Sequence, residues 1–147
     1  MTETSLLNST ILAQVLIVTG ASIFGALGWV HLLLTFFSHK FNAHNPQTTQ
    51  AMKETSPLIS KQTSMWNAWV GFNASHSLGA LLLSAVYIPL AIRHMALIEL
   101  SLWFSLLPCL TSLCYLVLAK RYWFNLPFTG ILISSLCFMT AFLVIHI

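Results

Sequence analysis

Residues 66–92 read WNAWVGFNASHSLGALLLSAVYIPLAI, and this stretch contains no Asp, Glu, Lys or Arg. A transmembrane helix needs about 20 predominantly apolar residues to cross the hydrocarbon core of a bilayer. Three further stretches are apolar and long enough to cross, at residues 11–37, 95–119 and 128–147. The sequence therefore predicts an all-α fold in which four helices cross the membrane.

The composition of the whole chain agrees with this prediction. Of the 147 residues, 57% are hydrophobic and only 6% are charged, whereas about 25% of the residues of a soluble domain carry charge. Six basic and three acidic side chains cannot supply the polar surface of a soluble domain, so lipid must be the solvent for most of this surface. We expect a single transmembrane domain over residues 1–147, in direct contact with the lipid bilayer.

The connections between the spans predict an integral membrane four-helix bundle with antiparallel, up-and-down connections. The turns at residues 93–94 and 120–127 are too short to join anything but neighbouring antiparallel helices. Residues 38–65 form a long polar loop, in which a short surface helix is expected near residues 50–54. Lys and Arg are scattered over these connections rather than gathered in one patch, so no nucleic acid is expected as a partner.

The distribution of Lys and Arg also predicts the orientation of the chain. The connections at residues 38–65 and 120–127 contain Lys40, Lys53, Lys61, Lys120 and Arg121, whereas the turn between them contains Arg93 alone. Positively charged residues are retained on the cytoplasmic side of a membrane. We therefore expect a protein of the inner membrane with a cytoplasmic loop at residues 38–65 and both termini periplasmic or extracellular.

Small residues recur on one side of the first two spans. Helices in lipid associate by close packing at small residues and by hydrogen bonds, because no hydrophobic force draws them together. Such positions are therefore expected to pack against helices of this chain, of a homo-oligomer or of a larger membrane complex. They are Gly25 and Gly28 on the first span and Gly71, Ser75 and Gly79 on the second.

Polar side chains line about a third of the circumference of the second span. An amide or imidazole is costly to bury in hydrocarbon without a hydrogen-bonding partner, so this stripe should face the interior of the bundle. His31 and Thr35 lie on one side of the first span and can meet it. The expected intramembrane polar core consists of His31, Thr35, Asn73, His76, Ser77, Ser84 and Tyr87, with Trp69 and Ala80 on the same face.

Three interpretations of this core stay open. It can be a hydrogen-bond cluster that fixes helix register, in a structural or accessory protein. It can handle protons in an oligomeric channel or carrier, because imidazole exchanges protons near neutral pH. It can hold haem or a metal in a redox or lipid-modifying enzyme, with His31, His76, Cys109 and Cys137 as candidate ligands, although their spacing matches no known metal signature.

Motifs that would identify an enzyme or a cofactor are missing from the sequence. There is no Walker loop, dinucleotide-binding glycine pattern, HExxH or serine elbow, so nucleotide-driven and hydrolytic chemistry have no support. The cofactor, if one is bound, is not identified. Cys109, Cys114 and Cys137 all lie in apolar runs and predict no disulfide framework.

Two further features bear on the third and fourth spans. Pro108 removes a backbone hydrogen bond in the middle of residues 95–119. It should bend that helix unless a neighbour such as Ser105 compensates, and a gating hinge is the alternative. His146, near the end of the sequence, is expected to be solvated, as are the loop histidines.

The segment WNAWVGFNASHSLG at residues 66–79 resembles a motif of a functionally uncharacterised family of small bacterial four-span membrane proteins. The resemblance extends to GWVHLLLTF at residues 28–36 and RYWFNLP at residues 121–127, and thus covers most of the chain. It implies the four-span architecture, a bacterial origin and no particular activity. The residues that match the pattern are His31, Asn73, Ser75, His76 and Gly79.

Overall fold

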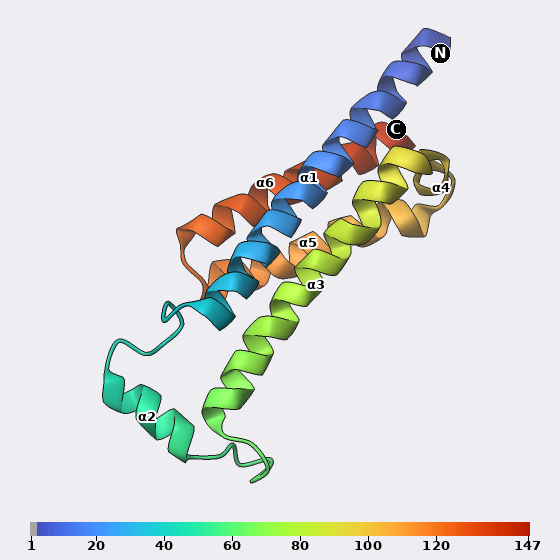
Figure 1. Ribbon diagram of the computed structural model, residues 1–147. Helices are drawn as coiled ribbons and strands as arrows, with labels where there is room; N and C mark the ends of the chain where they lie inside the picture. The colour runs from blue at the N-terminus through green and yellow to red at the C-terminus, as the bar shows by residue number, and fades with distance from the viewer. Residues whose placement is uncertain (1–2) are drawn as a thin grey trace. The chain divides into compact units, whose positions relative to one another are not determined.

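The structure is a computed structural model that describes residues 3–147, and it contains helices but no strands over that range (Figure 1). The first two residues of the expected domain lie outside the described part. The helices, in chain order, are α1 (Glu3–Phe37), α2 (Pro46–Glu54), α3 (Met65–Arg93), α4 (Met95–Leu100), α5 (Leu102–Tyr122) and α6 (Asn125–His146).

Within the described range, four segments are long and apolar enough to cross a membrane: Leu7–Phe37 of α1, and the whole of α3, α5 and α6. Their mean hydropathy lies between 1.6 and 2.2. At about 1.5 Å per residue, the 29 residues of α3 extend about 44 Å, and the 21 residues of α5 extend about 32 Å. Each exceeds the roughly 30 Å of the hydrocarbon core. The chain is therefore a multi-pass membrane protein, as the sequence predicted.

The chain divides into two compact units, and both α1 and α3 contribute to each. The core unit contains the described residues up to Leu27 together with Leu81–Ile147. The loop unit is Gly28–Ala80 and includes α2 and the polar connections on either side of it.

Helix pairs in the core unit are antiparallel. Gln14 of α1 bonds to Ala91 of α3, and eleven residues further along α1 Gly25 lies against Ser84, which comes earlier in α3. The pairing of α1 with α6 also runs in opposite directions, because Gly20 lies against Phe138 and Leu27 against Gly130. The predicted all-α antiparallel architecture is confirmed.

Aromatic rings fill the centre of the core unit. Phe24 is 1% exposed and meets Tyr115 edge-on, with 5.2 Å between ring centroids. Phe138 lies on another side of Phe24 at 6.4 Å. A Cβ on Gly20 would lie 3.1 Å from the Phe138 ring, so this glycine allows α1 and α6 to approach closely.

The apolar run predicted at residues 95–119 consists of two helices rather than one. Ser101 interrupts it with an extended backbone, and its side chain accepts a hydrogen bond from the Phe104 amide. Serine is a favoured N-cap because its oxygen satisfies one of the open amides of a new helix. The membrane-crossing helix is therefore α5, which starts at Leu102 and continues to Tyr122.

The polar loop and the last span also differ from expectation at their ends. The surface helix α2 starts at Pro46, earlier than expected, because the Asn45 side chain caps it by accepting from the Gln47 amide. The last span α6 starts at Asn125, so that Pro127 falls in its first turn, where proline costs no intrahelical bond.

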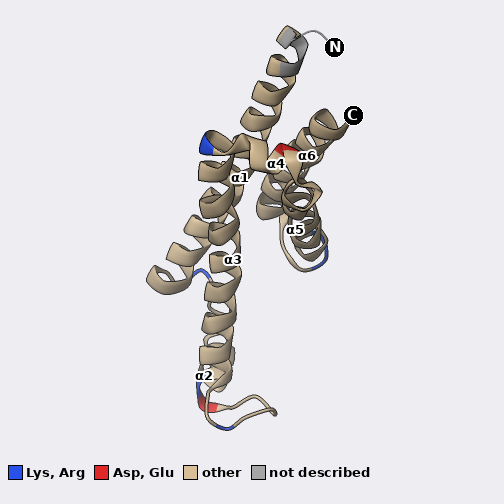
Figure 2. Cartoon of the chain, turned by 90° about the vertical axis from the view of Figure 1, so that its right-hand side faces the viewer, with Lys and Arg blue, Asp and Glu red and all other residues tan. Residues whose placement is uncertain are grey.

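Charged side chains lie at helix ends and in connections (Figure 2). In the core unit, Arg93 is in the last turn of α3, and Lys120 and Arg121 are in the last turn of α5. In the loop unit, Lys53 is in the last turn of α2. Cations at the ends of membrane-crossing helices can remain hydrated while the spans lie in lipid.

Candidate polar core of the loop unit

The centre of the candidate site is a hydrogen bond between the two spans of the loop unit. His31 Nε2 of α1 lies 3.1 Å from Asn73 Oδ1 of α3. Asn73 is 3% exposed, and its Nδ2 donates to the Trp69 carbonyl oxygen at 2.8 Å. Both ends of the Asn73 amide are therefore bonded, as a buried amide requires.

The geometry fixes the direction of every bond in this chain. The Trp69 carbonyl can only accept, so the group that faces it must be the Asn73 amide NH2. This turns the Asn73 oxygen toward His31, and that oxygen can also only accept. His31 therefore donates from Nε2, and its proton on that nitrogen is held in place by Asn73.

Two more rings flank His31. The ring centroid of His76 is 5.8 Å from that of His31, and the centroid of Phe41 is 4.6 Å away on the loop side. Both histidine side chains are half-buried. The structure thus brings His31, Asn73 and His76 into one cluster.

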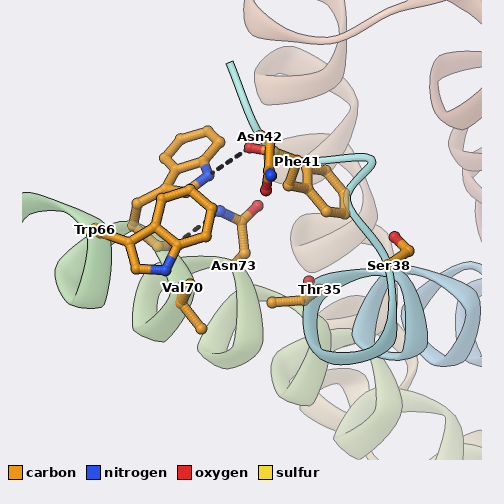
Figure 3. A pocket seen from close by; sticks show the side chains of 8 residues that line it. Thr35, Ser38, Phe41, Asn42, Trp66, Val70 and Asn73 are labelled. Atoms are coloured by element: carbon orange, nitrogen blue, oxygen red, sulfur yellow. Dashed lines mark hydrogen bonds between the residues drawn. The ribbon is translucent and has the colours of Figure 1, made fainter. Parts of the chain in front are cut away.

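A small pocket adjoins Asn73, with room for about one water molecule, about 10 Å³ (Figure 3). Trp69 Nε1 donates to the Phe41 carbonyl oxygen at 3.2 Å, which ties the connection after α1 to α3. Figure 3 shows Asn73 between the indole rings on one side and Phe41 on the other. The lining residues are Thr35, Ser38, Phe41, Asn42, Trp66, Trp69, Val70 and Asn73.

The hydroxyl groups expected in the polar core bond within their own helices. Thr35 Oγ1 donates to the His31 carbonyl at 2.8 Å, and Ser77 Oγ donates to the Asn73 carbonyl at 3.0 Å. Such bonds to the carbonyl four residues earlier satisfy a hydroxyl without a partner on another helix.

Ser84 and Tyr87, the remaining expected members, belong to the core unit. A Cβ on Gly25 would lie 2.8 Å from Ser84 Cβ, so Ser84 packs where α1 and α3 approach closely. Tyr87 is 2% exposed, and its hydroxyl donates to the Phe104 carbonyl at 2.8 Å. The polar stripe expected along α3 therefore belongs partly to the loop unit and partly to the core unit.

The residues expected at packing positions also differ in their exposure. Gly25 and Gly28 are shielded or buried, whereas Gly71, Ser75 and Gly79 are exposed. A Cβ added at Gly71 would meet no atom within 4 Å. This face of α3 is open in the isolated chain.

The candidate metal ligands do not form one group. His31 and His76 belong to the loop unit, while Cys109 and Cys137 are free thiols of the core unit. Among the residues that the structure describes, no three His, Cys, Asp or Glu side chains gather in a way that could hold a metal ion.

Two polar contacts of the core unit are not anticipated from the sequence. Gln14 Nε2 donates to the Ala91 carbonyl at 2.8 Å, close to the end of α3. His146 is exposed, as expected, but its Nε2 lies 2.7 Å from Ser105 Oγ. The signal for Gln14 was an amide in an apolar run, where burial requires a partner; nothing in the sequence marks the pairing of His146.

Comparisons of the chain with known protein families, with curated proteins and with solved structures gave no significant match. The site therefore has to be interpreted from its own geometry.

Proposed function

We propose that this chain is a structural or accessory protein of the bacterial inner membrane, in which the polar core holds α1, α3 and the intervening loop in register. The chain of hydrogen bonds from His31 through Asn73 to Trp69, continued from the Trp69 ring to Phe41, carries the proposal. The His31–Asn73 bond joins α1 to α3, and the Trp69–Phe41 bond joins α3 to the connection after α1. The Asn73–Trp69 bond lies within α3 and orients the Asn73 amide. The adjoining pocket has room for about one water molecule.

The proposed orientation follows from the cations. The polar loop and the connection after α5 hold Lys40, Lys53, Lys61, Lys120 and Arg121, which favours the cytoplasmic side for both. Both termini would then lie on the periplasmic or extracellular side. The resemblance to a bacterial four-span family is consistent with this location.

An accessory protein needs a surface for its partner. The exposed face formed by Gly71, Ser75 and Gly79 repeats a small residue every four positions along α3, which suits close packing against another span. We propose that this face contacts a second copy of the chain or another membrane protein. Gly71→Leu should weaken the association measured by energy transfer between labelled chains in vesicles, whereas Val117→Phe, at an exposed position of α5, should not.

The second candidate function is a proton-linked channel or carrier built as an oligomer. The 5.8 Å separation of the His31 and His76 rings favours it, because two imidazoles at such a distance can pass a proton through one water. Haem or metal binding by the same pair is the third candidate. It would be recognised by a Soret band or by bound metal in the purified protein.

The test compares stability with proton flux in vesicles containing the full chain. His31→Leu and His76→Leu are measured beside His94→Leu, which changes an exposed histidine directly after α3. The structural proposal expects His31→Leu to lower the free energy of unfolding and to leave flux at the background level of empty vesicles. Flux in the unaltered protein that disappears in a stably folded His31→Leu or His76→Leu variant would contradict it.

A further inference from the structure

The polar loop contains two fully exposed aliphatic side chains. Leu58 is 108% exposed and Ile59 is 94% exposed, relative to an extended chain. They occupy the two central positions of a turn that is closed by a hydrogen bond of 3.2 Å from the Ser60 amide to the Pro57 carbonyl. We call Leu58 and Ile59 the apolar tip. Water is an unfavourable surrounding for such a pair, so the tip should have an apolar surface to meet.

The base of this turn is fixed to the start of a membrane-crossing helix. The Met65 amide donates to the Thr55 carbonyl at 2.8 Å and closes residues 55–65 into a compact loop. Since Leu58 is three residues from Thr55, its Cα lies within about 11 Å of the closed base. This segment connects the end of α2 to the start of α3 (Figure 1).

The length of α3 places this base at the membrane surface. The helix extends about 44 Å, close to the roughly 40–45 Å of a bilayer that includes its headgroups. Met65, its first residue, is therefore expected among the headgroups. A side chain within about 11 Å of Met65 is within reach of the boundary between headgroups and acyl chains.

Cations flank the tip on both sides. Lys53 Nζ lies 5.7 Å from the centroid of the Trp66 ring, in the first turn of α3. Tryptophan is enriched at the level of the headgroups, so this contact holds the ammonium group at that level. Lys61 follows the tip, and the loop carries Lys40 as well, against Glu54 as its single acid. This excess of positive charge complements anionic headgroups.

We propose that the apolar tip inserts into the leaflet from which α3 emerges, while Lys53 and Lys61 bind anionic phospholipid headgroups. Aliphatic side chains between lysines are the combination by which peripheral segments attach to acidic membranes. The loop is thereby a lipid-binding element, and its attachment depends on the anionic lipid content of the leaflet. The proposal is independent of the function proposed for the polar core.

The test measures the depth of a spin label in the full chain. The label is placed at Leu58→Cys, after Cys109, Cys114 and Cys137 have been replaced by alanine, in vesicles of phosphatidylcholine with or without phosphatidylglycerol. Collisions with oxygen report the acyl region, and collisions with a water-soluble nickel chelate report water. Gln62→Cys is the matched control, because Gln62 is an exposed polar residue of the same loop.

With phosphatidylglycerol, the label at position 58 should favour oxygen and the label at position 62 should favour the nickel chelate. Lys53→Gln and Lys61→Gln should each lower the ratio of inserted to free tip about fivefold, the factor expected for one lysine at an anionic surface. Folding should be unaffected, because the tip side chains are fully exposed.

Two results would overturn the proposal. If the label at position 58 stays accessible to the nickel chelate in both kinds of vesicle, the tip lies in water. If it is shielded from both reagents in both kinds of vesicle, protein covers the tip instead of lipid.

Discussion

The core unit and the loop unit use polar side chains in different ways. In the core unit, Tyr87 and Gln14 donate to backbone carbonyls of other helices, those of Phe104 and Ala91. In the loop unit, the bond between α1 and α3 joins two side chains, His31 and Asn73. Both kinds of bond satisfy polar atoms in an apolar surrounding. The first supplies a backbone carbonyl with the donor that its own helix lacks, and the second aligns two helices.

The Phe104 and Ala91 carbonyls of the core unit lack a hydrogen-bond donor within their own helices, and each for an identifiable reason. In a regular helix the amide of residue 108 would donate to the carbonyl of residue 104, but Pro108 has no amide hydrogen. The Tyr87 hydroxyl replaces that donor. Ala91 lies in the last turn of α3, where carbonyls have no partner within the helix, and Gln14 supplies one. A polar residue in a membrane helix can thus be explained by a defect in a neighbouring helix.

The largest expected effect on stability comes from adding a methyl group to a glycine of the core unit, compared with the same change in the loop unit. Gly25→Ala places a Cβ 2.8 Å from Ser84 Cβ, and overpacking of this kind costs about 1–3 kcal/mol. Gly71→Ala meets no atom within 4 Å, so the higher helix propensity of alanine should leave stability unchanged or raise it by up to about 1 kcal/mol. The free energy of unfolding in bilayers is the measurement.

Ser84→Gly provides the control for this pair of variants. Combined with Gly25→Ala, it removes the clashing side chain and should recover most of the lost stability. Equal losses for Gly25→Ala and Gly71→Ala would mean that the two faces of α1 and α3 do not differ as described.

The next largest effect is expected at the centre of the polar core. Asn73→Leu keeps a side chain branched at Cγ but removes the acceptor of His31 and the donor to Trp69, which should cost about 1–2 kcal/mol of unfolding free energy. Asn67→Leu, at an exposed position of the same helix, should change stability by less than about 0.5 kcal/mol. An equal loss in the two variants would remove the special role of Asn73.

A smaller effect tests whether the Tyr87 hydroxyl replaces the backbone donor that α5 lacks at Pro108. Tyr87→Phe leaves the Phe104 carbonyl without its donor and should cost about 1 kcal/mol. Pro108→Ala restores the backbone amide, so the same Tyr87→Phe change should cost little in that background. A double-mutant cycle of unfolding free energies measures the difference. No coupling between the two positions would show that Tyr87 does not compensate for the proline.

The smallest effect concerns hydroxyls that bond within their own helix. Thr35→Val and Ser77→Ala remove donors to His31 and Asn73 carbonyls that keep helical partners, so each should change unfolding free energy by less than about 0.5 kcal/mol. A loss similar to that of Asn73→Leu would place these hydroxyls in the network between the spans.

The sequence predicted the helices well because their signal is local. Long apolar runs without charge identify membrane-crossing helices whatever their neighbours are. The break at Ser101 was not predicted, because the run continues on both sides and the capping bond of one serine carries no hydrophobic signal. Ser101 is recognisable as a cap only once the extended backbone is known.

The partners of polar residues could be predicted only in part. Helical periodicity placed His31, Asn73 and His76 in one core, and the structure brings these three together. The same periodicity grouped Tyr87 with them, although it bonds to α5. Periodicity gives the face of a helix but not the neighbour at each depth, so residues separated by several turns on one face can belong to different clusters.

The interpretation of Pro108 illustrates the same limit. Ser105 was the neighbour considered able to compensate for the missing amide, but its hydroxyl lies near the Ser101 and Leu102 carbonyls and His146. Ser105 does not fill this role, because a serine side chain reaches back along its own helix, whereas the open carbonyl belongs to Phe104. The donor came from α3, seventeen residues earlier in the sequence.

The most direct test of the account is the position of the proton on His31 in the full chain in bilayers. Nitrogen NMR spectra of isotope-labelled histidine distinguish protonated Nε2 from protonated Nδ1. The account predicts a neutral ring with its proton on Nε2, hydrogen-bonded and protected from exchange with water, and loss of that protection in Asn73→Leu. A proton on Nδ1, or one on Nε2 that exchanges freely with water, would contradict a structural core and favour proton transfer.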